Sequence, residues 1–240
     1  MDSLIVEIRM GAGGEEAALF AQDLFKMYAK YARLNNWKLT VLQRNASGLG
    51  GLKQIIFELK DSDILSKMKY EAGVHRVQRI PKTEKGNRIH TSTATVAVLP
   101  QPEPAEINLN PSDLKIEFFK SSGPGGQNVN KRQTAVRILH VPSGMTATSQ
   151  VSRNQEQNRK FALNILRAKL FENKRQATES EIRDRRKSQI GRAQRAEKIR
   201  TYNFPQDRIT DHRIKKTWHH IEKIMSGQLD PIIEKLRKAY

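Results

Sequence analysis

A proline-rich segment between residues 100 and 111 limits the fold of this chain more than any other feature. It contains Pro100, Pro102, Pro104 and Pro111. Proline fixes φ and has no backbone N–H to donate, so neither a helix nor a central strand continues through such a segment. We therefore expect a domain boundary here. A chain of 240 residues is long enough for two domains with separate cores.

The region before this boundary combines helix and strand patterns. Apolar residues recur at helical spacing from Glu15 to Leu34, directly after a glycine-rich turn. Strand-like patterns occur at residues 4–9, 37–42, 54–59 and 89–99. The fold class is therefore α+β, and we place this first domain at residues 1–105.

The region after the boundary predicts a strand-turn-strand-helix domain at residues 106–187, inserted into the first. Its expected strands are residues 114–119, 135–141 and 145–150, and its long, highly charged helix is residues 154–186. From Ser188 to Lys198 the pattern indicates a basic linker, and two short helices follow. We expect residues 188–240 to combine this linker with a C-terminal segment that packs on the first domain.

The charge of the chain points to a polyanionic partner. Lys and Arg number 43 against 25 Asp and Glu, which gives a formal net charge of +18. Nucleic acid is the expected partner, because neutralising phosphates releases counterions. We find no apolar run that could span a membrane and no export signal, so we expect a cytoplasmic protein without a membrane partner. The absence of cysteine excludes disulfides and thiolate metal sites, and the histidines form no metal or triad pattern, so neither a metal nor a cofactor is expected.

A glycine-rich loop, SSGPGGQNVNK at residues 121–131, lies between two expected strands. Its glycines allow backbone conformations that bring main-chain N–H groups close to a ligand. It does not end in Gly-Lys-Ser/Thr and does not precede a helix, so it is not a phosphate-binding P-loop. Taken alone, it would be an ordinary hairpin loop.

Together with three further stretches, this loop resembles the bacterial-type class I peptide chain release factors, closest to the type that reads UAA and UAG. The other stretches are GAGGEEAALFAQDLF, HRVQRIPKTEKGNRIHTSTATVAV and IRTYNFPQDRITDHRI, which occur in the family's order and are spread over nearly the whole length of the chain, from residue 11 to residue 214. The resemblance implies a codon-recognition domain and an inserted catalytic domain that carries the Gly-Gly-Gln loop. The chain begins at what corresponds to the family's second domain, which leaves stimulation by the recycling GTPase open.

The resemblance assigns catalysis to Gly125, Gly126 and Gln127. In the family, the backbone N–H of the glutamine stabilises the oxyanion that develops when water attacks the peptidyl-tRNA ester, and its side chain helps to seat the water. The ribosome's peptidyl-transferase RNA supplies the rest of the site, so hydrolysis is promoted only as part of the ribosome. The resemblance also makes Gln127 a target of N5-methylation, with a glutamine N5-methyltransferase as a partner.

Stop-codon recognition is implied for two groups of residues. Pro81, Lys82 and Thr83 resemble the Pro-x-Thr tripeptide of factors that read UAA and UAG, in which the threonine accepts from a second-position adenine. The remaining expected readers are Gly13 and Glu16 for the first base, His90 for the second, and Gln78 with Thr91 for the third. An amide both donates and accepts, which suits a third position that is A or G.

The partners implied are ribosomal RNA, the mRNA stop codon and the P-site peptidyl-tRNA, with the factor acting as a monomer. The Gly191–Lys198 linker lacks the Gly- and Asp-containing run common in the family's switch loop. Whether this linker couples codon recognition to domain opening therefore stays open. One alternative is a ribosome-rescue hydrolase of the same superfamily, which frees stalled ribosomes without a normal stop codon. Another is a non-catalytic ribosomal RNA-binding protein, which would leave the Gly125–Gln127 loop unexplained.

Overall fold

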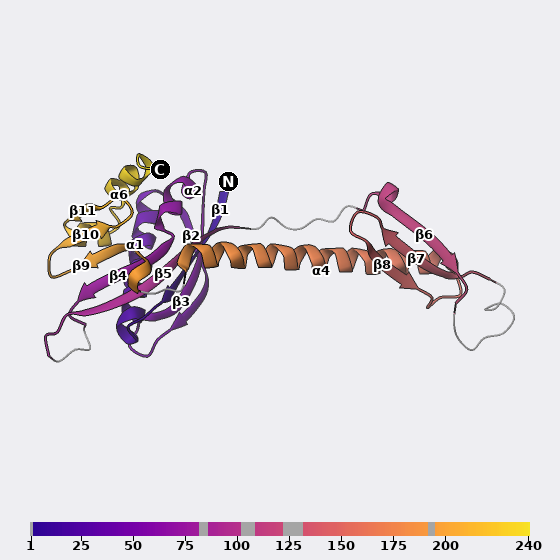
Figure 1. The fold of residues 1–240 in the computed structure, drawn as a ribbon, viewed down its shortest axis with the longest axis horizontal. Coiled ribbons are helices and arrows are strands. Elements are labelled where there is room, and N and C mark those ends of the chain that lie inside the picture. Colours follow the sequence, from indigo (N-terminus) through magenta and orange to yellow (C-terminus); the bar gives the residue numbers. More distant parts are fainter. Residues whose placement is uncertain (1, 82–85, 102–108, 122–131, 192–194) are drawn as a thin grey trace. The chain divides into compact units, whose positions relative to one another are not determined.

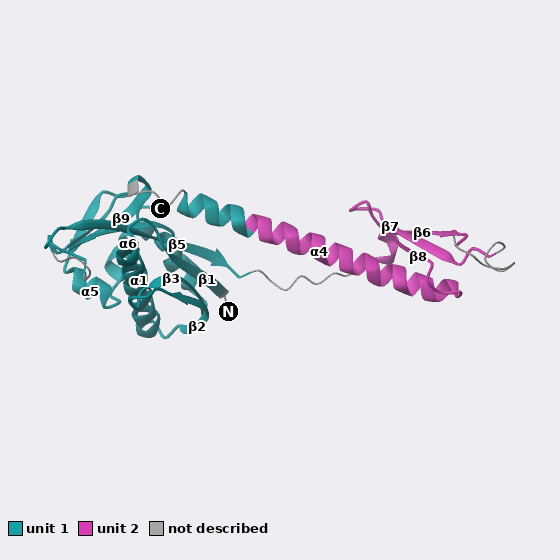
Figure 2. Ribbon diagram, turned by 90° about the horizontal axis from the view of Figure 1, so that it is seen from below, with its two compact units in different colours: residues 1–101, 182–240 teal, residues 102–181 magenta. Residues whose placement is uncertain are grey.

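The computed structural model describes residues 2–81, 86–101, 109–121, 132–191 and 195–240. The chain divides into two compact units, residues 1–101 with 182–240 and residues 102–181 (Figure 2). These limits lie a few residues from the domain limits expected from the sequence. The division of function between the two units remains a prediction.

The first unit is built on an eight-stranded sheet in the order β11-β10-β9-β4-β5-β1-β3-β2 (Figure 1). Its strands are β1 (Asp2–Met10), β2 (Lys38–Ala46), β3 (Leu52–Asp61), β4 (Gly73–Arg79), β5 (His90–Pro100), β9 (Lys198–Asn203), β10 (Arg208–Asp211) and β11 (Lys216–His219). Its helices are α1 (Glu15–Leu34), α2 (Ile64–Met68), α5 (Ile221–Met225) and α6 (Asp230–Arg237), with part of α4, and short 3₁₀ turns occur at Lys69–Glu71 and Arg195–Glu197. All neighbouring strands are antiparallel except β4 and β9, which pair in parallel and join the two chain segments into one sheet.

The core of the first unit lies between α1 and one face of this sheet. Helix α1 buries Phe20, Leu24 and Met27 completely, and the strands facing it bury Val6 and Phe57. Apolar residues at i, i+4 and i+7 form one stripe of a helix, so the sequence pattern of α1 fixes which side faces the sheet. Helices α5 and α6 extend this core through Ile221, Ile224, Ile232, Ile233 and Leu236.

The second unit is a three-stranded antiparallel sheet with one helix. Strands β6 (Leu114–Phe119), β7 (Ala135–His140) and β8 (Met145–Ser149) lie in the order β6-β7-β8, and α4 (Gln155–Ile190) follows. A 3₁₀ turn at Pro111–Asp113 leads into β6. The core is small, with Val136, Ile138, Ala147, Ala162 and Leu166 fully buried.

The strands and helices expected from the sequence are confirmed, with ends that shift by a few residues. The expected start of the linker at Ser188 is wrong, because Ser188 still lies in a helix. Helix α4 continues to Ile190, because the Gln189 side chain bonds to both the N–H and the C=O of Val98 at 2.9 and 2.8 Å. It ends where Gly191 has a φ of +52°, a left-handed conformation that glycine adopts readily at a helix end.

Sequence patterns missed β4, β9, β10 and β11. Strand β9 places Arg200, which is fully buried, at a core position, and this charge hides the apolar alternation. Among the described residues, no helix combines the length and apolar character that crossing a membrane requires.

Candidate functional site

The residues expected to read a codon lie around the paired ends of β4 and β5. Strands β4 and β5 are antiparallel, and their register sets Gln78 opposite Thr91 and Arg79 opposite His90. His90 is exposed and Thr91 partly exposed. Pro81, just beyond β4, is buried, whereas Lys82 and Thr83 lie outside the described residues.

The loop before α1 is tied to the same part of β5. The N–H of Gly11 donates to the Thr93 carbonyl at 2.8 Å and the N–H of Thr93 donates to the Ala12 carbonyl at 2.8 Å. The N–H of Ala12 donates to Thr93 Oγ1 at 2.9 Å. Gly13 has a φ of +131°, and a Cβ there would lie 2.3 Å from Ser92 Oγ. Only glycine fits this position, so the close approach of the α1 start to β5 depends on Gly13.

Glu16 is held in the first turn of α1 by an arginine from β4. Arg79 Nε lies 2.5 Å from Glu16 Oε1, and Arg79 Nη1 lies 2.8 Å from Asp23 Oδ2. Burial alone would lower the pKa of Arg79, but the two carboxylates outweigh it and raise the pKa. Glu16 is buried, and within the described residues its Oε2 has no hydrogen-bond partner. One oxygen of Glu16 is therefore fixed by the fold, while the other is shielded from solvent.

Strand β9 supports Gln78 from the side opposite β5. The N–H of Phe204 donates to the Gln78 carbonyl at 3.0 Å, and Asn203 Nδ2 donates to Gln78 Oε1 at 3.4 Å. The Phe204 ring also packs against the Arg79 guanidinium, whose carbon lies 5.3 Å from the ring centre. Gln78 is thus positioned by the neighbouring strand on each side.

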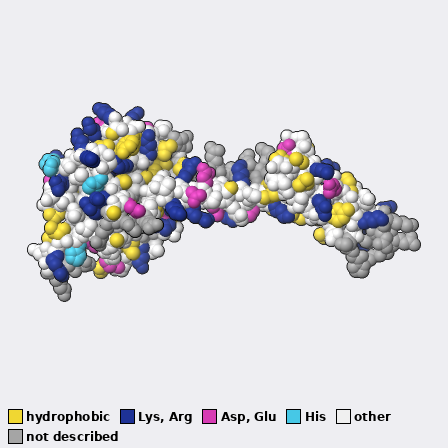
Figure 3. Space-filling model, in the orientation of Figure 1, with side chains coloured by type: hydrophobic (Ala, Val, Ile, Leu, Met, Phe, Trp, Pro, Cys, Tyr) yellow, Lys and Arg dark blue, Asp and Glu magenta, His cyan; other side chains and the backbone are white. Residues whose placement is uncertain are grey.

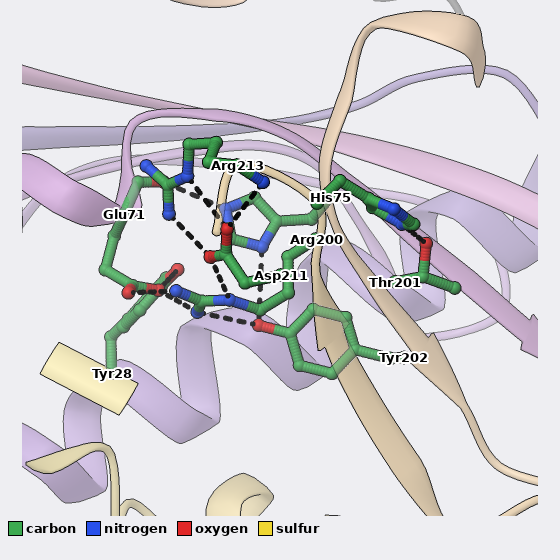
Figure 4. Close-up of polar contacts among 9 residues, drawn as sticks. Tyr28, Glu71, His75, Arg200, Thr201, Tyr202, Asp211 and Arg213 are labelled. Atoms are coloured by element: carbon green, nitrogen blue, oxygen red, sulfur yellow. Dashed lines mark hydrogen bonds and ion pairs between the residues drawn. The ribbon is translucent and has the colours of Figure 1, made fainter. Parts of the chain in front are cut away.

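A buried polar network fastens β9 and β10 to β4 and α1 (Figure 4). The fully buried Arg200 donates to both carboxylate oxygens of Glu71 at 2.7 and 2.8 Å and lies 3.3 Å from Asp211. Tyr28 of α1 donates to Glu71 at 2.9 Å. Burial would raise the pKa of Glu71, but the Arg200 charge and its hydrogen bonds outweigh burial and lower it. Removing one member of such a network leaves an unpaired buried charge, so the network acts as a unit.

Two further groups of the network are neutral at physiological pH. Burial and the Arg200 charge lower the pKa of His75 to about 4, and its Nε2 lies 2.9 Å from the Glu71 carbonyl oxygen. Burial raises the pKa of Tyr202 to about 12. Arg213 completes the network by donating to Asp211 at 2.7 and 3.1 Å.

The Gly125–Gln127 segment lies outside the described residues, but the strands on either side of it are described. Phe119, the last residue of β6, pairs with Ala135, the first residue of β7. Buried Asn158 of α4 donates to the carbonyls of Thr134 and Ser152, both at 2.8 Å, and accepts from the Ser152 N–H at 2.9 Å. Asn158 therefore anchors the chain where it enters β7.

Comparison with known proteins identifies the family. A PCRF domain matches residues 1–96 and an RF-1 domain matches residues 103–213. Peptide chain release factor 1 of Thermotoga maritima is 55% identical over 235 residues, which are 98% of this chain and 69% of the relative. The chain belongs to the peptide chain release factor 1 family. The family member from Carboxydothermus hydrogenoformans is 53% identical over 234 residues, 98% of this chain and 65% of that relative. The chain thus spans about two thirds of the length of these release factors.

A solved structure of this wider family supports the fold. The structure described as RF2 of Thermus thermophilus matches with a TM-score of 0.59 and 34% identity, over 99% of this chain and 68% of that one. The mixed α+β fold expected from the sequence is confirmed.

Sequence reasoning missed the side chains that position the expected codon readers of this release factor family member. Arg79 holds Glu16 and is itself held by Asp23, Asn203 contacts Gln78, and Asn158 anchors the start of β7. Arg79 and Asn203 lie within stretches that resemble the family, which is the one signal that could have found them. The described part of the chain holds no cluster of three or more His, Asp or Glu side chains that could bind a metal ion.

Proposed function

We propose that this chain ends translation by reading UAA and UAG in the ribosomal A site and triggering hydrolysis of the peptidyl-tRNA ester. The observation that carries the proposal is the convergence of Gly13, Glu16, Gln78, His90 and Thr91 at one end of the β4–β5 pair. These residues come from a loop, a helix and two strands, and Pro81, the first residue of the Pro81–Thr83 tripeptide, lies two residues after the end of β4.

The chemistry of these groups suits an RNA triplet. Single-stranded bases are read by stacking and by hydrogen bonds to their exposed edges. The backbone N–H groups at the start of α1 offer donors to a first-position uracil, and Arg79 fixes Glu16 in this first turn. The exposed ring of His90 is a stacking surface for the second base. Gln78 and Thr91, which are cross-strand neighbours, offer an amide and a hydroxyl to the third.

Hydrolysis is assigned to the Gly125–Gln127 segment. A water molecule attacks the ester carbonyl carbon, the bond to the tRNA ribose oxygen breaks, and that oxygen takes a proton. The backbone N–H of Gln127 stabilises the developing oxyanion, and Gly125 and Gly126 allow the chain to present it. Ribosomal RNA completes the site, so ribosomal RNA, mRNA and peptidyl-tRNA are the proposed partners of a monomeric factor.

The test is peptide release from ribosomes programmed with UAA, UAG, UGA, a sense codon or no codon in the A site. Release should occur with UAA and UAG and be weak with UGA, because one base read by hydrogen bonds gives about 1 to 3 kcal/mol of discrimination. Equal release with an empty A site would favour the rescue hydrolase instead. If no complex releases its peptide, the remaining alternative is a non-catalytic protein that binds ribosomal RNA.

A second arm tests the hydrolytic step by single-turnover release at saturating factor. Gln127→Ala keeps the N–H and should retain much of the rate, whereas Gln127→Pro removes it, and losing one such donor costs about 100-fold to 1,000-fold. Gly126→Ala controls for backbone restriction, and ribosome binding is followed separately. Equal damage from Gln127→Ala and Gln127→Pro would assign catalysis to the side chain.

A further inference from the structure

The outer face of the sheet carries a row of polar side chains beside Gln78. Side chains alternate between the two faces of a strand, so buried His75 and Val77 face the core while Arg76 shares the other face with Gln78. Arg76 Nε donates to Thr201 Oγ1 on β9 at 3.1 Å. In Figure 4, Thr201 points away from the buried network around Arg200.

A histidine and a lysine complete a cluster around Thr201. His212 Nε2 lies 2.7 Å from Thr201 Oγ1, and the His212 N–H donates to the Ile199 carbonyl at 2.8 Å. Lys198 begins β9 and pairs with Val74 of β4. Burial lowers the pKa of His212, and the charges of Lys198 and Arg76 lower it further while Asp211 opposes them. Arg76 and Lys198 therefore both lie near enough to His212 to disfavour its protonation.

Nothing in the described chain neutralises this cluster. Among the described residues, neither Arg76 nor Lys198 forms an ion pair, and both Asp211 oxygens are engaged by Arg200 and Arg213. Burial lowers the pKa of Arg76 without an opposing carboxylate. Two partly buried cations thus lie beside the same histidine without an anionic partner in the described chain, and an anion bound there would be favoured by both charges.

The chemistry of the cluster specifies the kind of anion. A guanidinium and an ammonium are donors that phosphate oxygens accept in nucleic-acid complexes. Thr201 and a neutral His212 use one proton in their mutual hydrogen bond and leave one further proton to donate. Arg76 lies two residues before Gln78 on the same face, a step of about 7 Å along the strand. Lys and Arg side chains are prominent on the part of the first unit that Figure 3 shows. The chain carries 43 Lys and Arg against 25 Asp and Glu, an excess that favours a polyanionic partner.

We infer that Arg76, Lys198 and His212, with the Thr201 hydroxyl, form a binding site for one RNA phosphate next to the third-base readers. The inference rests on the proposed function for its location on the ribosome, because that function places Gln78 and Thr91 against the codon. A phosphate contact carries no base specificity. The site would therefore raise affinity for every codon equally.

The test compares wild type with Arg76→Gln, Lys198→Gln and the double variant in equilibrium binding to UAA-programmed ribosomes over a range of salt. Arg44→Gln, on the exposed edge strand β2, is the matched control for lost positive charge. The slope of log K against log salt should fall by about 1 in the double variant. Its affinity defect then grows about tenfold for each tenfold fall in salt, while Arg44→Gln follows wild type.

Further measurements separate this site from its alternatives. Arg76→Lys keeps the charge and should retain most of the binding, whereas equal damage from Arg76→Lys and Arg76→Gln would make Arg76 a support for Thr201 only. Thermal melts identify variants that are misfolded. The ratio of UAA to UGA release should stay unchanged in every folded variant. A double variant with wild-type affinity and slope would overturn the inference.

Two mRNAs identify the source of the phosphate, one ending at the stop codon and one extended beyond it. A defect confined to the extended mRNA assigns the phosphate to the nucleotides after the codon, and a defect on both assigns it to the codon's own phosphates or to ribosomal RNA. Binding of a 12-nucleotide oligouridine at low salt makes the test independent of termination. The double variant should bind the oligouridine more weakly than Arg44→Gln does, even if the protein reads no stop codon. If the double variant and Arg44→Gln bind equally well both to oligouridine and to ribosomes, the site is excluded.

Discussion

Arg79 shows how one residue decides the geometry of a candidate base reader. It joins the end of β4 to the first turn of α1 through Glu16, and the two side chains are 16% and 5% exposed. A carboxylate buried to this extent needs a partner for its charge. The position of Glu16 therefore depends on a strand that lies more than 60 residues later in the chain.

We predict that Arg79→Met destabilises the protein by about 3 kcal/mol, because it leaves the Glu16 carboxylate buried without its partner. Urea unfolding followed by tryptophan fluorescence measures this. Asp23→Asn removes the second, 30% exposed carboxylate and should cost less than about 1 kcal/mol. Similar losses from both variants would show that Glu16 does not depend on the pair.

His75 gives the first unit a defined response to acid. Its pKa is about 4 in the folded chain and about 6.5 when unfolded. Between these values the unfolded state binds a proton that the folded state does not, so stability is complete above pH 6.5 and falls as the pH approaches 4. The pKa of Glu71 is lowered in the folded chain. Glu71 therefore adds a further loss of stability once the pH falls below the pKa that its carboxyl group has in the unfolded chain.

We therefore predict that the free energy of unfolding falls by up to about 1.4 kcal/mol per pH unit between pH 6.5 and 4 on account of His75. His75→Gln should be less stable at pH 7 but show a flatter dependence over this range. Unfolding curves at several pH values measure the slope. An unchanged slope in His75→Gln would assign the acid response to other groups.

The sequence predicted those site residues that lie in recognisable local motifs, and it did not predict residues whose contacts are far apart along the chain. Gly13, Glu16, Gln78 and Thr91 lie in local motifs, and the structure brings these four together. Asn203 could not be placed, because its contact with Gln78 spans 125 residues and requires the parallel pairing of β4 with β9. Arg200 occupies a core position of β9, so this strand lacks the alternation of apolar residues that predicts a strand. The pairing of β9 with β4 could therefore not be inferred.

At the scale of elements, the last turns of α4 are joined to the sheet of the first unit by side chains. Gln189 bonds to both backbone groups of Val98, just beyond the point where the pairing of β5 with β4 ends at Val96. Arg186 Nε lies 2.7 Å from the buried Glu7 Oε2. The helix end thus replaces a strand partner that β5 lacks.

We predict that Gln189→Leu destabilises the first unit by about 2 kcal/mol, since it leaves the N–H and C=O of Val98 without partners. Gln176→Leu makes the same change at an exposed position of the same helix and should stay within about 0.5 kcal/mol of wild type. Chemical denaturation compares the two. A loss no larger than that of Gln176→Leu would mean that water satisfies Val98.

At the scale of the whole molecule, the two units have separate cores of unequal size. Among the described residues, the core cluster of the second unit contains five fully buried apolar side chains, whereas that of the first extends over the eight-stranded sheet and its helices. A smaller core stabilises a unit less. The chain contains two tryptophans, Trp37 and Trp218, and both lie in the first unit.

We predict that the second unit unfolds at lower urea concentration than the first. Circular dichroism at 222 nm follows all the helices, of which α4 is the longest with 36 residues, and should begin to change before tryptophan fluorescence, which reports on the first unit alone. Ile138→Ala should shift only the earlier transition, because its cavity costs about 2 to 5 kcal/mol in the second core. Coincident curves from both probes would instead indicate a single cooperative unit.

The parallel pairing of β4 with β9 also determines how long β4 stays without this neighbour while the chain is synthesised. A nascent chain grows at roughly 5 to 20 residues per second, and paired residues of the two strands are 125 positions apart. Strand β4 therefore waits roughly 6 to 25 s for its neighbour, with Glu71 still lacking the arginine that neutralises it. During that interval the open edge is able to pair with other chains. Slow codons before residue 198 should therefore lower the yield of properly folded chain.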